Sequence, residues 1–376
     1  MKKTELCSDC GIPLMIGKEL SWEDNGVITL RRSPLNRMVF YESRVIDNLF
    51  QGIERLIGLP IEHIVIESRR RDVRKYIERS FPGWVIGSLR WAGKYADDPG
   101  LLGRAIRRPA MEVGKALTLR VMEMGRLYGY GRAELGEGWE RDDPFPWRES
   151  LVRHPYSVPF WSADALGSAE AIEGVEQWVK YESLGEETYR VTTYPSEHPV
   201  ELKERLRRRK KYPFKPGNIA FQRCPSCGLP LELSRYRWYP EEGIIIDMEN
   251  DWRMSIFGPQ ALEAVLDDLE SELGEDIPRV VVEAQKGYIK SRTGQMNWRR
   301  SGTTFNKLTA LRGMGNITGF EADEKHLSVR IQNACLPLIM VGMAQALYEI
   351  ALGLEDSTYE WELSDDGDLD IIVKAG

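Results

Sequence analysis

The chain of 376 residues lacks any apolar run that approaches the roughly 18–20 residues needed to span a bilayer. It also lacks a basic excess. Its formal net charge of −7 argues against attraction of the whole surface to nucleic acid, although a local basic patch is compatible with it. The N-terminus, Met-Lys-Lys-Thr-Glu-Leu-Cys, has the charge of a signal peptide without the apolar core that follows in one. We therefore expect a cytoplasmic protein.

Histidine and cysteine are both scarce, with four and five residues. Four of the five cysteines stand in Cys-x-x-Cys pairs, a pattern that fits a metal in a reducing compartment better than a disulfide framework. The sequence contains no Walker-type phosphate loop. What it does contain is 42% hydrophobic and 29% charged residues, the composition of a globular protein with room for two domains.

The paired cysteines form two Cys-x-x-Cys-Gly motifs, Cys7–Cys10 and Cys224–Cys227. Two thiolates on one tight turn can face one ion, and the glycine permits the positive φ of that turn. Each motif supplies two ligands, whereas a structural zinc takes four. We therefore predict one structural Zn²⁺ held by Cys7, Cys10, Cys224 and Cys227, with no open position for catalysis.

Three alternatives stay open for these cysteines. Each motif could complete its own site with other residues, the pairs could be redox-active dithiols, or iron could replace zinc in the all-thiolate cage. Cys335 stands alone before Leu336-Pro337 and is expected to be a small core residue. His198 lies in a Ser-Glu-His-Pro loop, and nothing in its surroundings singles it out as a ligand.

The resemblance between the two motifs extends far beyond the cysteines. At an offset of 216 to 217 residues the chain repeats a glycine turn, a β-branched strand, an amphipathic helix and a second short apolar run. Each copy later has a helix and a closing hairpin, which in the second copy turns at Asp366-Gly367. The predicted elements are strands Val27–Leu30 and Ile244–Ile246, helices Val45–Ile57 and Leu262–Leu273, strands Ile64–Glu67 and Val280–Glu283, and helices Ala163–Trp178 and Leu338–Leu352.

This repetition predicts the fold class and the domain organisation. We expect an α+β protein made of two tandem copies of one unit, packed as a pseudo-twofold dimer. The first copy covers residues 1–200, a basic and proline-rich linker covers 201–217, and the second copy covers 218–376. The copies differ most at 81–161, where the first carries an insertion rich in glycine, proline and aromatic residues.

The insertion offers a candidate ligand pocket. Tryptophan presents a large apolar face with one polar atom, which suits a flat or apolar ligand. The alternative is that these side chains only pack the insertion onto its domain. The candidate pocket residues are Trp84, Trp91, Trp139, Trp147 and Trp161.

Other charged residues permit further chemistry. Glu67 and Glu283 end matching predicted strands, and we expect them to pair with nearby arginines rather than to act as an acid and a base. The runs Arg69–Arg71 and Arg205–Lys211 are expected on a solvated face, with phosphate or nucleic acid as the alternative partner. An enzyme would need convergent groups in the insertion, where Glu134, Glu137, Asp142, Asp143 and His154 are available.

The second half of each copy resembles the 4-vinyl-reductase type of domain, a small α+β domain of hydrocarbon-sensing regulators and tetrapyrrole-related proteins. The residues that carry the resemblance in the second copy are the turn at Gly315–Gly319, Val329–Asn333, the helix from Leu338 and the closing hairpin. The matching stretches in the first copy are Gly125–Gly131, His154-Pro155, the helix from Ala163 and the hairpin through Tyr189. The family often has cysteines in the closing helix and hairpin, whereas here the paired cysteines lie at the start of each copy.

The resemblance implies a pocket for a hydrophobic small molecule and a tendency of domains to pair. We therefore expect a zinc-stabilised protein that binds or senses a hydrophobic or tetrapyrrole-like ligand, or serves as an accessory factor, rather than an enzyme. One alternative is a nucleic-acid-associated factor that uses the cysteine motifs and the arginine runs. Another is an enzyme with its active site in the insertion.

Overall fold

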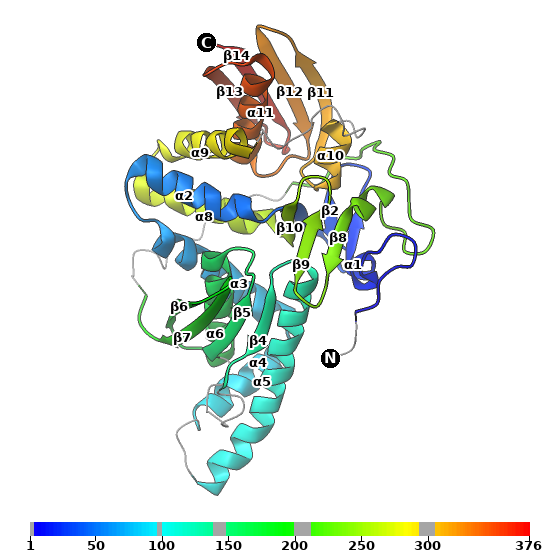
Figure 1. Ribbon diagram of the computed structural model, residues 1–376. Helices are drawn as coiled ribbons and strands as arrows, with labels where there is room; N and C mark the ends of the chain where they lie inside the picture. The colour runs from blue at the N-terminus through cyan, green and yellow to red at the C-terminus, as the bar shows by residue number, and fades with distance from the viewer. Residues whose placement is uncertain (1–3, 96–99, 138–147, 199–211, 293–304) are drawn as a thin grey trace. The chain divides into compact units, whose positions relative to one another are not determined.

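The computed structural model describes residues 4–95, 100–137, 148–198, 212–292 and 305–376 (Figure 1). It divides into two compact units. Unit 1 is Met1–Ile61, Arg208–Trp238 and Ile245–Gly376, and unit 2 is Glu62–Arg207 and Tyr239–Ile244. These units cut across the predicted boundaries at 200 and 218, because the first 61 residues belong with the C-terminal part of the chain. The fold is of the α+β class, as predicted.

Unit 1 holds the following elements: α1 (Leu14–Glu19), β1 (Leu20–Trp22), β2 (Ile28–Leu30), β3 (Ser33–Glu42), α2 (Arg44–Ile57), η3 (Leu231–Arg235), β8 (Tyr236–Tyr239), β9 (Ile244–Asp247), β10 (Trp252–Phe257), α8 (Pro259–Leu273), α9 (Ile277–Arg292), α10 (Phe305–Leu311), β11 (Asn316–Ala322), β12 (His326–Gln332), α11 (Pro337–Leu352), β13 (Ser357–Leu363) and β14 (Leu369–Ala375). Unit 2 holds the following elements: α3 (Glu62–Ser80), α4 (Gly83–Gly93), α5 (Leu101–Leu127), β4 (Arg132–Leu135), β5 (Glu149–Arg153), α6 (Val158–Glu173), β6 (Gln177–Gly185) and β7 (Thr188–Pro195).

A six-stranded antiparallel sheet joins the N-terminal parts of the two sequence copies. Its order is β1-β2-β3-β10-β9-β8, so β3 and β10 form the central pair. In their register Phe40 faces Ile256, the residue 216 positions further on, and the pairs on either side are Tyr41 with Ser255 and Val39 with Phe257. The register is therefore symmetric about one pair. Packing of both whole copies about a twofold axis stays a prediction.

Each unit also has a four-stranded antiparallel sheet, and the two sheets share one connectivity. Their orders are β11-β12-β14-β13 in unit 1 and β4-β5-β7-β6 in unit 2. In both, a helix of 16 residues links the second strand to the third in sequence, α11 in unit 1 and α6 in unit 2. These helices end in left-handed glycines, Gly353 and Gly174, which close the last turn without a Cβ penalty.

The predicted strands Ile64–Glu67 and Val280–Glu283 are wrong, because both runs lie inside helices, α3 and α9. A short β-branched run is ambiguous between a buried strand and a buried helical segment. Burial decides the matter here, since α3 packs against α6 and α9 packs against α11 and α2. The helix and hairpin predictions are confirmed by α2, α8, α6, α11 and the pairs β6–β7 and β13–β14.

In each unit one glycine contact joins a hairpin turn to a glycine-rich turn, and the turn of the β8–β9 hairpin belongs to unit 2. In unit 1, Gly315 N–H donates to the Gly26 carbonyl at 3.0 Å, at the turn between β1 and β2. In unit 2, Gly131 N–H donates to the Gly243 carbonyl at 2.9 Å. A Cβ at Gly26 would stand 2.2 Å from the Gly315 oxygen, so this approach requires glycine. Each hairpin turn thus contacts a glycine-rich turn that the sequence assigns to the other copy.

Candidate functional site

The two cysteine motifs fold into the same local structure. Cys7 N–H donates to the Ile12 carbonyl at 2.8 Å, and Gly11 N–H donates to the Cys7 carbonyl at 2.9 Å. The second motif repeats both bonds at 2.8 Å, from Cys224 to Leu229 and from Gly228 to Cys224. The glycines have φ of 72° and 73°, the left-handed conformation that the sequence motif predicts. Each of the two turns therefore presents two thiols from one hydrogen-bonded loop.

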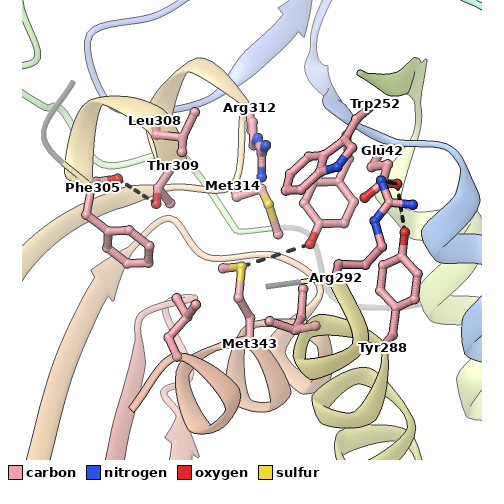
Figure 2. A pocket seen from close by; sticks show the side chains of 13 residues that line it. Glu42, Trp252, Tyr288, Arg292, Phe305, Leu308, Thr309, Arg312, Met314 and Met343 are labelled. Atoms are coloured by element: carbon pink, nitrogen blue, oxygen red, sulfur yellow. Dashed lines mark hydrogen bonds and ion pairs between the residues drawn. The ribbon is translucent and has the colours of Figure 1, made fainter. Parts of the chain in front are cut away.

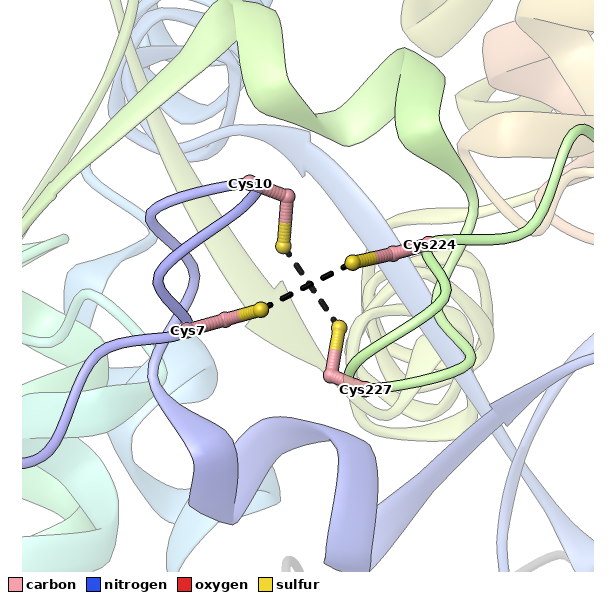
Figure 3. A group of neighbouring side chains, drawn as sticks. All are labelled: Cys7, Cys10, Cys224 and Cys227. Carbon is pink, nitrogen blue, oxygen red and sulfur yellow. Dashed lines mark hydrogen bonds between the residues drawn. The ribbon is translucent and has the colours of Figure 1, made fainter.

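All four thiols of the motifs meet at one point in unit 1 (Figure 3). The Sγ atoms of Cys7 and Cys224 are 3.6 Å apart, and those of Cys10 and Cys227 are 3.5 Å apart. All four sulfurs lie within 4.8 Å of one another. A tetrahedral site with metal–sulfur bonds of about 2.3 Å has sulfur–sulfur edges of about 3.8 Å. The four cysteines are therefore placed to bind one metal ion between them.

Further contacts support the thiol cluster. Burial raises the pKa of Cys7, but hydrogen bonds from the backbone of Cys10 and Asp9 outweigh burial and lower it to about 7. Burial raises the pKa of Cys10 and that of Cys227. Ser226 donates to an Asp9 carboxylate oxygen at 2.6 Å, which ties one turn to the other. An ion that needs thiolates would displace the remaining protons on binding.

Cys335 lies apart from this cluster. Its side chain is buried, its Sγ is 3.8 Å from the Gly313 carbonyl oxygen, and burial raises its pKa to about 12. Such a thiol stays protonated at neutral pH and is a poor nucleophile. The prediction that Cys335 is a core residue is confirmed.

The candidate pocket tryptophans occupy unlike positions. Trp84 and Trp91 lie on α4 with 75% and 50% of their surfaces exposed. Trp161 is buried in α6. Trp139 and Trp147 fall outside the described residues. A pocket in the described part of unit 1 is lined by none of the three placed tryptophans.

This pocket is a cavity of about 40 Å³ between α9, α10, α11 and the β3–β10 pair (Figure 2). Most of its wall surface is apolar, and its charged lining residues are Glu42, Arg292 and Arg312. A water molecule needs about 10–15 Å³ of such space, so the cavity has room for about three. The lining includes Tyr41, Glu42, Trp252, Tyr288, Arg292, Arg312 and Met343.

Two arginines line the cavity, and only one of them has a carboxylate partner among the described residues. Arg292 forms an ion pair with Glu42 at 3.1 Å, and Tyr288 donates to the same carboxylate at 2.7 Å. Arg312 is only 8% exposed, and its guanidinium carbon lies 5.4 Å from the centre of the Tyr41 ring. No described acceptor bonds its Nε. The charge of Arg312 also acts on the Glu42 carboxylate, but no described carboxylate forms an ion pair with Arg312.

Glu42 shares its negative charge between Arg292 and Arg312, and the other groups that face Arg312 among the described cavity residues are aromatic rings. The Tyr41 ring and the Trp252 ring, 6.0 Å from the guanidinium carbon, supply cation–π attraction. Such contacts are weaker than a charge-assisted hydrogen bond, and a guanidinium has five donors. The cavity therefore has the chemistry to accept one small oxyanion.

A second polar cluster is buried in unit 2. His198 lies between two carboxylates, with its Nδ1 3.0 Å from Glu67 and its Nε2 2.5 Å from Glu170. Arg70 forms ion pairs with both glutamates. Burial lowers the pKa of His198, but the two carboxylates outweigh burial and raise this pKa. Burial raises the pKa of Glu67, but His198 and Arg70 outweigh burial and lower this pKa to about 2.

This cluster could not be predicted, because its members stand far apart along the chain. The prediction that Glu67 pairs with an arginine is confirmed. The available signal for His198 was a lone histidine in a polar loop, which is weak. Unit 1 has a related arrangement at the equivalent helical positions, where the buried Glu349 pairs with Lys286 and Lys290. Each cluster joins two packed helices through buried ion pairs, α3 with α6 and α9 with α11.

The arginine run lies inside the fold, and two of the enzymatic candidates have ionic partners of their own. Arg70 and Arg71 are buried in α3, and Arg69 forms an ion pair with Asp164 at 2.8 Å, so this run lies in the fold and the predicted solvated face is wrong. Glu134 pairs with Arg132, Glu137 is exposed, and His154 pairs with Glu187. Asp142, Asp143 and Arg205–Lys211 lie outside the described residues.

No family model matches the chain, and no curated protein and no solved structure matches it. The resemblance to 4-vinyl-reductase-type domains therefore stays a hypothesis. What can be said of function rests on the cysteine cluster and the cavity.

Proposed function

We propose that this chain is a zinc-stabilised protein that binds or senses a small organic anion, with Arg312 as the group that recognises the ligand. The observation that carries the proposal is a buried guanidinium on the wall of a cavity, with no described carboxylate to pair with it. The zinc has a structural part, since four thiolates saturate its coordination. A cage of four thiolates suits zinc or iron, and of the two we propose zinc.

The size of the cavity limits the ligand. A volume of about 40 Å³ is far below the roughly 300–1,000 Å³ of pockets that hold drug-sized molecules. A tetrapyrrole is therefore a poor fit, and we propose a carboxylate of a few heavy atoms. Apolar walls formed by Trp252 and Met343 favour a short alkyl group beside the charged end.

The expected affinity follows from the ligand's size. At no more than about 1.5 kcal/mol per heavy atom, a four-atom carboxylate such as acetate gains at most about 6 kcal/mol. That corresponds to a dissociation constant no tighter than tens of micromolar. Calorimetry or ligand-observed NMR at millimolar ligand is therefore the appropriate measurement.

The test compares formate, acetate and propionate with the neutral isostere acetamide. The native protein should bind the carboxylates and reject acetamide, and Arg312→Gln should weaken carboxylate binding at least tenfold. Arg330→Gln is the matched control, because Arg330 is an exposed residue paired with Asp370 on the sheet of the same unit. Equal binding by native protein and Arg312→Gln, or no carboxylate binding at all, would overturn the proposal.

The nucleic-acid alternative is less well supported. Arg69 and Arg70 form ion pairs with carboxylates, and Arg70 and Arg71 are buried, so this run is poorly placed to bind phosphate. The enzymatic alternative lacks a convergent set of groups at Glu134 and His154 within the described residues, where each has its own ionic partner. Neither alternative has an observation in its favour comparable to Arg312.

A further inference from the structure

Helices α4 and α5 of unit 2 expose an unusual amount of apolar surface. Trp84 and Trp91 stand two turns apart on one face of α4. At the start of α5, Leu101 and Leu102 are 85% and 65% exposed. Isolated exposed apolar residues are ordinary, but a concentration of large ones on adjoining helices marks an interaction surface. These two helices, Gly83–Gly93 and Leu101–Leu127, are called the arm below.

Five exposed apolar residues of α5 follow the helical repeat. Steps of three and four residues connect one stripe along the solvent side of the helix, and every member is exposed. The stripe consists of Leu102, Ala105, Pro109, Val113 and Ala116. An exposed stripe of this kind has the form of a second apolar face, in addition to the face that α5 turns toward α4.

Basic residues share the exposed surface of α5 with the stripe. Helix α5 carries six basic and two acidic residues, in a chain whose formal net charge is −7. Arg104, Arg108 and Arg120 are exposed, and none of them forms an ion pair with a carboxylate in the described part of the chain. Concentrated positive charge beside exposed leucine and tryptophan is typical of helices that lie in the plane of an anionic membrane surface.

We propose that the arm docks onto an anionic lipid bilayer surface, with Trp84, Leu101 and Leu102 entering the boundary between headgroups and acyl chains and the arginines of α5 contacting lipid phosphates. The arm would lie on the membrane, since no helix among the described residues is long and apolar enough to cross it.

Charge and side-chain type select this occupant over two others. A second copy of the chain docking through the same surface would bring two basic α5 helices together, and their like charges repel. A nucleic acid would satisfy the arginines and could stack on tryptophan, but it has no apolar phase for Leu101 and Leu102. A bilayer with anionic headgroups satisfies both kinds of group at once.

The test measures flotation of the full-length protein with vesicles of phosphatidylcholine alone and with about 30 mol% phosphatidylserine added. We expect at least tenfold tighter binding to the anionic vesicles. Because the arginines act through screened charges, raising the salt from about 50 mM to about 500 mM should release the protein. Quenching of tryptophan fluorescence by brominated acyl chains should be reduced by Trp84→Phe.

Two pairs of variants separate the contributions. Leu101→Ser with Leu102→Ser, and Arg104→Gln with Arg108→Gln, should each lower binding to anionic vesicles at least tenfold. The matched control is Leu56→Ser with Leu59→Ser, an exposed leucine pair in unit 1 that should leave binding unchanged. Thermal melts of all variants check folding, which exposed positions should preserve.

Three outcomes would overturn the proposal. The first is no binding to either kind of vesicle. The second is binding that ignores both the lipid charge and the arm variants. The third is that a different occupant is found. Either the leucine pair controls self-association in sedimentation, or the arginine pair controls binding to RNA or DNA while the protein does not bind vesicles. None of these outcomes depends on a ligand at Arg312, so the result is independent of the proposed function.

Discussion

Loss of the metal should remove a large part of the stability of unit 1. An ion bound by the four cysteines would join Cys7 to Cys224 and Cys10 to Cys227, and each link would close a loop of 217 residues. Like a disulfide, such a link restricts the unfolded chain. The perturbations are removal of the ion with a chelator, and Cys224→Ser, which leaves three thiol ligands.

The magnitude follows from the loop length. In the chain-entropy model a closed loop of 217 residues lowers the entropy of the unfolded chain by about 18 cal/mol/K, or about 5 kcal/mol at 25 °C. Globular domains have about 5–15 kcal/mol of stability in total. For a unit of this size, 5 kcal/mol corresponds to a fall in Tm of about 10–20 °C.

The assay has two parts, metal content and unfolding. Elemental analysis should find one zinc per chain in native protein and in Cys335→Ala, the control for loss of a buried thiol outside the cluster. Cys224→Ser should lose zinc and have a lower Tm than native protein. A chelator should lower the Tm of native protein but change the Tm of Cys224→Ser little. A protein that carries no zinc and takes none up, or that loses zinc with an unchanged Tm, would refute the reasoning.

Two further predictions concern single residues. Gly26→Ala should lower the free energy of unfolding in denaturant by more than about 2 kcal/mol, because it adds a backbone clash at Gly315 to a strained φ. The control Gly58→Ala, with φ +72° and open space around it, should lower this free energy by only about 1 kcal/mol. Equal losses would contradict the contact between Gly26 and Gly315. The raised pKa of His198 gives stability that is fully present below its ordinary value of 6.5 and is lost as the pH rises through the folded-state value. Melts between about pH 5 and 9 should show this loss. His198→Gln should remove that pH dependence, and an unchanged slope would show that another group titrates. The lowered pKa of Glu67 acts in the opposite direction, with stability present above 4.5 and lost as the pH falls toward 2.

The cysteine cluster was predictable because its information is local and repeated. Each Cys-x-x-Cys-Gly motif specifies its own turn, and two half-sites in one chain suggest one whole site. The helices α2, α8, α6 and α11 were predictable for a similar reason, since each shows helical periodicity over several turns. The runs at Ile64 and Val280 were too short to show a period, and contacts with other helices decided their structure.

The cavity could not be predicted, because its groups come from distant parts of the sequence. Tyr41, Trp252, Arg312 and Met343 belong to four separate elements or turns. The residues beside Arg312 in the sequence do not indicate whether it forms an ion pair in the fold. The lack of an ion pair with a described carboxylate is the property that makes Arg312 a candidate ligand-binding residue. The same holds for His198, whose two carboxylate partners lie on different helices.

The central β3–β10 pair has a consequence for how the protein is made. Phe40 leaves the ribosome 216 residues before Ile256, which at about 5–20 residues per second means a wait of about 10–40 s. During that interval the nascent β3 has an open hydrogen-bonding edge, the kind of edge that recruits strands from other chains. A fragment ending near residue 200 would keep that edge permanently, so such fragments should be prone to aggregation.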